Sequence, residues 1–220
     1  MDKIKGRNPL PKIIIVLVII QLTRMIIRQL LFKFVDQTNL NCDITAMLTM
    51  CLLTALIVFI ANKQKITLSF VPNIHSTKGR IGYIFSTILA AFLILSTPYF
   101  NSNFSANLII PLVYSTIVTP VFEELIFRGY VWNELAMNFK SEFKVYIIST
   151  IFFAVWHLGY IDIIWFKMYL RGEVIGLQFA MFMKVITGLI FGIIIGWVRY
   201  KTKNCYAAML IHSIMNVFGR

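Results

Sequence analysis

The chain has 220 residues, of which 59% are hydrophobic and 14% charged, and its formal net charge is +12. Soluble proteins are usually about 45–50% apolar. This composition, with a mean hydropathy of +0.79, therefore excludes an ordinary soluble domain and predicts an all-α, polytopic membrane protein. The positive charge then indicates basic loops that face the cytoplasm and anionic lipid, and no nucleic-acid partner. Three cysteines, an odd number without metal-ligand spacing, suggest no disulfide framework.

Apolar runs long enough to cross a bilayer recur along the chain. The first is interrupted by polar residues and either crosses the membrane or lies along its surface. The last is short for a span. The sequence predicts a bundle of about six to eight transmembrane helices, with no internal repeat and no long linker. In chain order the runs are Ile13–Phe34, Ile44–Ala61, Ile81–Phe100, Leu108–Phe127, Phe143–Ile161, Val174–Val198 and Tyr206–Phe218.

Loop charge predicts the orientation of the bundle. Besides the first dozen residues, basic side chains concentrate in Asn62–Arg80, Arg128–Lys144 and Arg199–Lys203, whereas Val35–Asp43 and Asn101–Ser105 hold none. These segments alternate along the chain, so the rule that basic loops stay inside predicts a cytoplasmic N-terminus.

Three basic residues of the first run fit this scheme poorly. Arg24, Arg28 and Lys33 lie toward the end of the run that should face outward. If the first run does not cross the membrane, the helix count changes, and so does the orientation at one end of the chain.

A few polar side chains lie inside the apolar runs. Of the nine acidic residues, we expect only Glu123 and Glu124 in such a run. An ionisable residue within the membrane costs about 2.5–3.5 kcal/mol on insertion scales and marks a functional site by default. The other polar side chains of this kind are Arg128, His157, Lys184, His212 and Asn216.

Helical spacing separates the two glutamates. Glu124 and Arg128 are four residues apart, so they share a helix face and can form an ion pair. Glu123 points about 100° away, so we expect it to lack a partner and to be free to exchange a proton. Pro120 precedes both glutamates and can kink the helix or free backbone groups beside them.

Two further helices offer polar groups for the same site. His212 and Asn216 are four residues apart and face one way, and His157 lies in the run before. Each alone could be a structural contact between membrane helices. Together with the two glutamates they favour one functional cluster.

The motifs EELIFR (123–128), FAVWH (153–157) and HSIMN (212–216) resemble the signature motifs of the CPBP family. These are the CAAX-protease and bacteriocin-processing membrane proteins, also called the Abi family. The segment GLIFG (188–192) adds to the resemblance, which covers Leu108–Phe218. It divides one membrane domain, 1–220, into variable N-terminal helices (1–106) and a protease-like core (107–218).

The resemblance implies an all-helical intramembrane endopeptidase, a hydrolase in the plasma membrane of a bacterium. Glu123 would be the general base that activates water, and His157 would assist it. His212 and Asn216 would position the water or bind the oxyanion. Glu124 and Arg128 would form a structural ion pair at the site.

The residues themselves favour attack by water, because no serine or cysteine lies in a nucleophile-like setting beside these histidines. Zinc is possible, with Glu123, His157 and His212 as its ligands. The HExxH arrangement is absent, so we favour a mechanism without a cofactor. The site can close only if the helix with the first motif continues past Arg128 or is broken at Pro120. We expect the former, a helix of roughly 20 residues from Pro120.

The substrate would be a membrane-associated or lipidated peptide, as in CAAX-prenyl-protease-like cleavage, bacteriocin processing or self-immunity. Membrane lipid is the other partner. Two alternatives stay open: a catalytically idle immunity or scaffold protein with the same fold, and a proton-coupled transporter that uses Glu123 and the histidines as a relay.

Overall fold

The computed structural model describes residues 8–63, 68 and 77–219, which form helices and contain no strand. Six helical segments in this part are long and apolar enough to cross a membrane, and a seventh, Cys205–Phe218, is shorter. The predicted bundle of six to eight helices is thereby confirmed. Its elements are α1 (Leu10–Phe32), α2 (Asn39–Lys63), α3 (Thr77–Phe100), α4 (Ala106–Val113), η1 (Tyr114–Val118), α5 (Thr119–Glu124), η2 (Leu125–Val131), α6 (Trp132–Asn138), α7 (Glu142–Trp156), η3 (His157–Tyr160), α8 (Ile161–Arg171), η4 (Val174–Gly176), α9 (Leu177–Thr202) and α10 (Cys205–Phe218).

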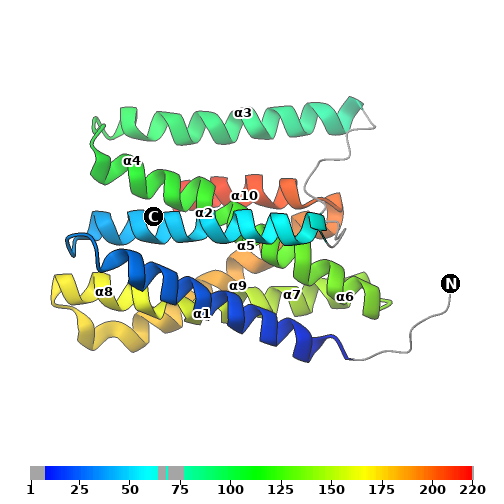
Figure 1. The fold of residues 1–220 in the computed structure, drawn as a ribbon. Helices are drawn as coiled ribbons and strands as arrows, with labels where there is room; N and C mark the ends of the chain where they lie inside the picture. Colours follow the sequence, from blue (N-terminus) through cyan, green and yellow to red (C-terminus); the bar gives the residue numbers. More distant parts are fainter. Residues whose placement is uncertain (1–7, 64–67, 69–76, 220) are drawn as a thin grey trace.

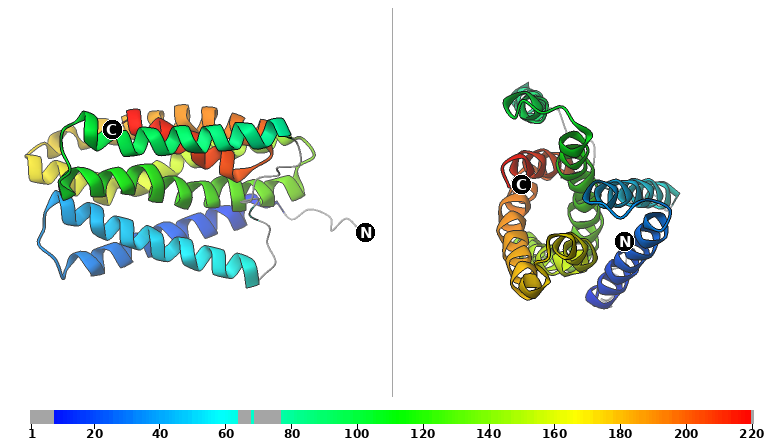
Figure 2. Two further views of the ribbon diagram at one scale, coloured as in Figure 1. Left: turned by 90° about the horizontal axis from the view of Figure 1, so that it is seen from above. Right: turned by 90° about the vertical axis from the view of Figure 1, so that its left-hand side faces the viewer.

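The helices lie roughly along one direction (Figure 1). In the end-on view of Figure 2, the helices from α4 onward form a ring, with α1 and α2 on one side of it and α3 standing outside. One polar link between α3 and α10 joins the hydroxyls of Thr87 and Tyr206 at 2.9 Å. All three motifs come after α4 in the chain, so they lie on helices of the ring.

The helix that carries the first motif is longer than its apolar run. It continues from Ala106 to Asn138 as one candidate span, so the expected extension past Arg128 is present. It contains two π-helical turns, η1 before the glutamates and η2 around Arg128. Such turns are frequent at functional sites.

Pro120 explains where the first π-helical turn leaves a free carbonyl group. The Thr119 amide donates to the Tyr114 carbonyl, five residues back. In that register the Ser115 carbonyl would need the amide hydrogen of residue 120, which a proline lacks. The Asn216 side chain supplies the donor instead, with its Nδ2 2.7 Å from the Ser115 oxygen. A backbone defect thus fixes α10 against η1.

Three glycines on one face of α9 let α7 approach closely. A Cβ at Gly188 would lie 2.6 Å from His157 Nδ1, and one at Gly196 would lie 2.9 Å from the Tyr146 ring. Gly192, between them, offers its carbonyl oxygen to Thr150 Oγ1 at 3.2 Å. Small residues four apart are a common way for membrane helices to pack.

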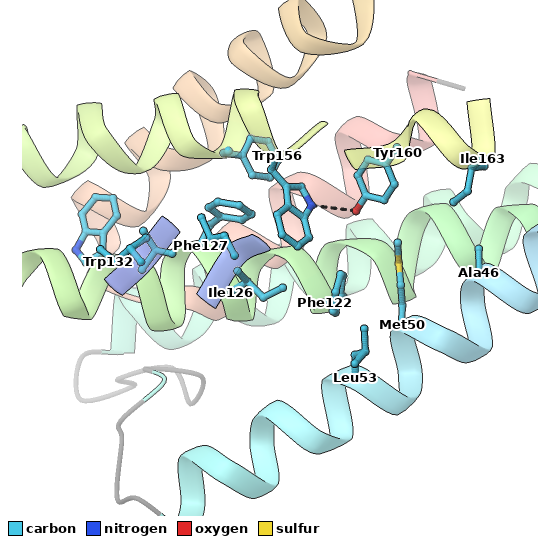
Figure 3. Packing of buried hydrophobic residues seen from close by; sticks show 14 of the residues in the cluster. Ala46, Met50, Leu53, Phe122, Ile126, Phe127, Trp132, Trp156, Tyr160 and Ile163 are labelled. Atoms are coloured by element: carbon cyan, nitrogen blue, oxygen red, sulfur yellow. Dashed lines mark hydrogen bonds between the residues drawn. The ribbon is translucent and has the colours of Figure 1, made fainter. Parts of the chain in front are cut away.

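Aromatic side chains fill the centre of the ring. Phe127 packs edge to face on Phe153 and Trp156, with ring centroids 5.2 and 5.5 Å apart. Figure 3 shows Phe122 and Trp156 in the same layer, with Met50 of α2 beside them. This packing joins η2, which carries Phe127, to α7, which carries Phe153 and Trp156.

The two arginines that fit the predicted orientation poorly have a structural role. Arg24 and Arg28 are buried, and both pair with Asp162 at the start of α8, at 2.8 and 2.7 Å. Arg24 also donates to the Gly159 carbonyl. The two arginines share one carboxylate, which compensates part of their charge inside the protein. Both side chains are buried in the bundle and not in a loop, where basic residues indicate orientation.

The expectation that only Glu123 and Glu124 would lie in apolar runs was wrong. Asp162, Asp43 and Glu134 are also buried, and all three lie within candidate spans. Each is paired: Asp43 with Lys167 at 2.6 Å and Glu134 with Lys12 at 2.9 Å. Polar residues near the ends of these spans made the apolar runs in the sequence shorter than the helices, so the three acidic residues lay outside those runs.

Candidate active site

Glu124 is the centre of a buried polar cluster. Arg128 Nη1 donates to its Oε1 at 3.2 Å, and Arg128 Nε lies 3.2 Å from its Oε2. Both side chains have no exposed surface. Arg128 Nη2 donates to the Gly192 carbonyl at 3.3 Å, and Arg199 Nε donates to the Arg128 carbonyl at 3.2 Å. The pair ties α5 and η2 to α9.

His212 of α10 joins the two glutamates. Its Nδ1 lies 2.8 Å from Glu124 Oε1, and its Nε2 lies 3.8 Å from Glu123 Oε2. A carboxylate oxygen facing Nδ1 accepts, so we assign the proton to this nitrogen. Nε2 is then directed at Glu123.

Glu123 is buried, with 1% of its surface exposed. The Tyr160 hydroxyl donates to its Oε1 at 2.5 Å, and the same hydroxyl accepts from Trp156 Nε1 at 3.2 Å, the bond drawn in Figure 3. Its Oε2 accepts no hydrogen bond. Oε1 is therefore held by a hydrogen bond, and Oε2 is buried without a hydrogen-bond partner among the described residues.

The expectation that Glu123 lacks a partner was wrong, and Tyr160 was the residue that sequence reasoning missed. Glu123 and Tyr160 are 37 residues apart, and no helical spacing relates residues of different helices. The signal that could have found Tyr160 is its place three residues, about one turn, after His157.

His157 lies where α7 gives way to the 3₁₀ turn η3. Its Nδ1 is 2.8 Å from the Phe153 carbonyl oxygen. A carbonyl can only accept, so Nδ1 carries the proton and the neutral ring has its lone pair on Nε2. The Phe153 ring packs edge to face on both His157 and His212, with centroids 4.9 and 5.9 Å apart.

These groups line one cavity of about 290 Å³. Glu123, His157, His212 and Asn216 all contribute to its wall, together with Tyr160. Glu124 and Arg128 lie behind it. The arrangement offers a water molecule an open carboxylate oxygen, two imidazoles and an amide, which are the groups that general acid–base chemistry uses.

No group of three or more His, Cys, Asp or Glu side chains in the described part of the chain is placed to hold a metal ion. Both ring nitrogens of His212 already face carboxylates. Of the three proposed zinc ligands, Glu123 Oε2 lacks a hydrogen bond, and the bond to Phe153 leaves His157 Nε2 free.

A family profile described as type II CAAX prenyl endopeptidase Rce1-like matches residues 104–218. This match covers more than half of the chain. The chain belongs to this family. With six helices in its described part that are long and apolar enough to cross a membrane, it is an integral membrane protein.

Two curated relatives are similar to this chain. UPF0177 protein YxdF of Lactococcus lactis is 32% identical over 103 residues, which are 47% of this chain and 44% of the relative. CAAX prenyl protease 2 of Methanococcus maripaludis is 28% identical over 138 residues, which are 57% of this chain and 49% of the relative. The chain thus spans about half the length of these relatives. No solved structure matches it.

The two neighbouring glutamates should differ in their effect on stability. Glu124→Gln leaves the buried Arg128 without its counter-ion and should cost about 3–5 kcal/mol. Glu123→Gln keeps an oxygen that accepts from Tyr160, so it should cost only about 1 kcal/mol. Thermal unfolding in detergent measures both. Equal losses, or a larger loss for Glu123→Gln, would reject the division of roles.

Proposed function

We propose that this protein is an intramembrane endopeptidase that hydrolyses a peptide bond of a membrane-associated or lipidated substrate. The observation that carries the proposal is the open Oε2 of Glu123, buried and without a hydrogen bond beside the cavity that it shares with His157. Glu124 Oε2 and Arg128 Nε also lack a hydrogen bond in the described part of the chain, but they lie 3.2 Å from each other as an ion pair. Glu123 belongs to the cavity wall, so its unpaired oxygen fits a place kept for a reacting water. Family membership supports the same reaction.

In this mechanism water loses a proton to Glu123 Oε2 as its oxygen attacks the carbonyl carbon. Tyr160 holds the other carboxylate oxygen, so the proton arrives at Oε2. The proton that Glu123 took from water then passes to His157 Nε2 and from there to the leaving nitrogen as the C–N bond breaks. Glu124 and Arg128 take no proton and keep His212 in place.

Donors for the oxyanion would come from α10. Asn216 spends one amide hydrogen on the Ser115 carbonyl, and the other remains for the substrate. His212 Nε2 can donate when the ring is doubly protonated. Losing one such donor typically costs about 10²–10³ in rate.

CAAX cleavage, bacteriocin processing and self-immunity are the roles that this reaction could serve. The relative from M. maripaludis carries the name of a CAAX prenyl protease, which supports a lipidated peptide as substrate. Such a substrate would reach the site from the surrounding lipid.

We also propose that the N-terminus lies in the cytoplasm of a bacterial cell. Lys12, Lys63, Lys140 and Lys203 lie at or next to the start of α1 and the ends of α2, α6 and α9. These helix ends lie on the right in Figure 1. Because Arg24 and Arg28 are paired internally, they no longer oppose this orientation. The cavity is lined by Asp43 near the start of α2, Lys167 of α8 and Gly219 after α10. The start of α2 and α8 lie toward the other end of the bundle in Figure 1, so the substrate would approach from the outer half of the surrounding lipid.

Cleavage should depend on Glu123 and His157 and not on a metal ion. Glu123→Ala and His157→Ala should each lower kcat by about 10²–10⁴, the usual contribution of acid–base catalysis. Activity should survive exhaustive chelation. The assay compares small membrane peptides between cells that carry each variant and wild-type cells, then repeats the cleavage with purified protein.

A matched control for this assay is Glu134→Gln. Glu134 is a buried carboxylate on the same continuous helix, but it pairs with Lys12 and lies outside the cavity, so this variant should stay active. Cleavage that chelators abolish and zinc restores would overturn the mechanism without metal. Normal cleavage by Glu123→Ala would reject the protease assignment in favour of a scaffold or transporter.

The orientation can be tested with single cysteines at two exposed positions, one in the loop after α1 and one in the loop after α6. A membrane-impermeant maleimide added to intact cells should label Gln37→Cys, which follows α1, and should spare Lys140→Cys until the cells are opened. The wild-type protein, whose exposed Cys51 lies within α2, gives the background. The reverse labelling pattern would place the N-terminus outside and contradict the proposed orientation.

A further inference from the structure

Lys184 is a charged side chain for which the proposed reaction has no use. It lies in the apolar first half of α9, between Met183 and Val185, within a candidate membrane span. A lysine in such a segment is costly and usually marks a functional position. It is exposed and lies on the wall of the catalytic cavity.

The position of Lys184 relative to the catalytic groups follows from helix geometry. Gly188, four residues later, lies directly against the His157 imidazole. Residues four apart share a helix face, so Lys184 lies about one turn from the point where α9 touches His157. Along α9 this turn leads toward Leu177, the start of the helix.

The ion pairs of the cavity wall, within the described part of the chain, do not include Lys184. This wall contains two lysines and two carboxylates. Lys167 pairs with Asp43 at 2.6 Å. Glu123 accepts a hydrogen bond from the neutral Tyr160 hydroxyl, which leaves its charge in place, and its carboxylate is assigned to the reacting water. Within the described part of the chain, Lys184 has no ion pair at all. The cavity therefore offers an incoming ligand one positive charge without a counter-ion.

We propose that Lys184 binds a carboxylate of the peptide substrate and thereby sets which peptide bond lies against Glu123. This inference rests on the proposed protease function. The carboxylate belongs either to the peptide's C-terminus or to an aspartate or glutamate side chain, since these are the anions that a peptide carries. A long, flexible ammonium group suits either one, because it acts as a point charge.

The position favours the substrate over a lipid phosphate. A lysine that only reached for headgroups would be expected near a helix end, facing lipid. Lys184 is seven residues into α9, about 10 Å from its start, and contributes to the cavity wall. Because Lys184 and Glu123 are both anchored on the wall of one cavity, a carboxylate bound at Lys184 would determine which peptide bond reaches Glu123.

The test uses a pool of N-terminally palmitoylated peptides of random sequence in vesicles of zwitterionic phosphatidylcholine. One half of the pool ends in a free carboxylate and the other half in a carboxamide. Purified wild-type protein and Lys184→Met are compared by mass spectrometry of the products. Lys201→Met, at the far end of the same helix, is the matched control, and Lys184→Arg should act like the wild type.

We expect wild-type protein to prefer peptides with a carboxylate at one fixed separation from the cleaved bond. Lys184→Met should lower kcat/KM for these peptides by about 10- to 100-fold, the worth of one charge-assisted hydrogen bond, and leave neutral peptides unchanged. A preference confined to the carboxylate-ended half identifies the C-terminus, and one present in both halves identifies a side chain.

An equal loss on acidic and neutral peptides, or no loss at all, overturns the inference. So does an effect of Lys184→Met that appears only when anionic lipid is added and ignores the peptide's charge, because it would assign the lysine to headgroups. In each of these outcomes cleavage still depends on Glu123. Cleavage that survives Glu123→Ala instead overturns the proposed function itself.

Discussion

A carboxylate in the membrane interior must be paired, and the ion pair between Glu124 and Arg128 is the interaction on which the rest of the site depends. Burying an unpaired charge would cost several kcal/mol. Glu124 meets this requirement on its own helix and then uses an oxygen to hold His212 from α10. Arg128 extends the same network to the α9 backbone. The pair thus connects three helices of the ring.

The two neighbouring glutamates differ in what faces their second oxygen. Among the described residues, neither Glu124 Oε2 nor Glu123 Oε2 accepts a hydrogen bond, but Glu124 Oε2 lies 3.2 Å from the Arg128 guanidinium, whereas Glu123 Oε2 has only the His212 imidazole, at 3.8 Å. A site that activates water needs an acceptor that the protein does not occupy. The fold supplies it by placing two adjacent carboxylates on different faces of one helix, one against an arginine and the other against a cavity. Backbone irregularities complete the arrangement, as the Asn216 contact to Ser115 shows.

The sequence predicts what depends on local periodicity. Hydropathy identifies the spans, and the four-residue spacing of Glu124 and Arg128 predicts a pair that the structure contains. Contacts between distant segments are different. The bond from Tyr160 to Glu123 and the pairing of Arg24 and Arg28 with Asp162 join residues far apart in the chain. Their partners depend on how the helices are arranged, which spacing along one helix does not contain.

The central claim is that Glu123 activates a water molecule and does not itself attack the peptide. A single-turnover cleavage in water enriched in ¹⁸O, with enzyme in excess over peptide, tests it most directly. Direct attack by water predicts one ¹⁸O atom in the new carboxylate of the product from the first turnover, and no label in the enzyme. A first product without label, together with ¹⁸O in the Glu123 carboxylate, would show a covalent anhydride and contradict the account.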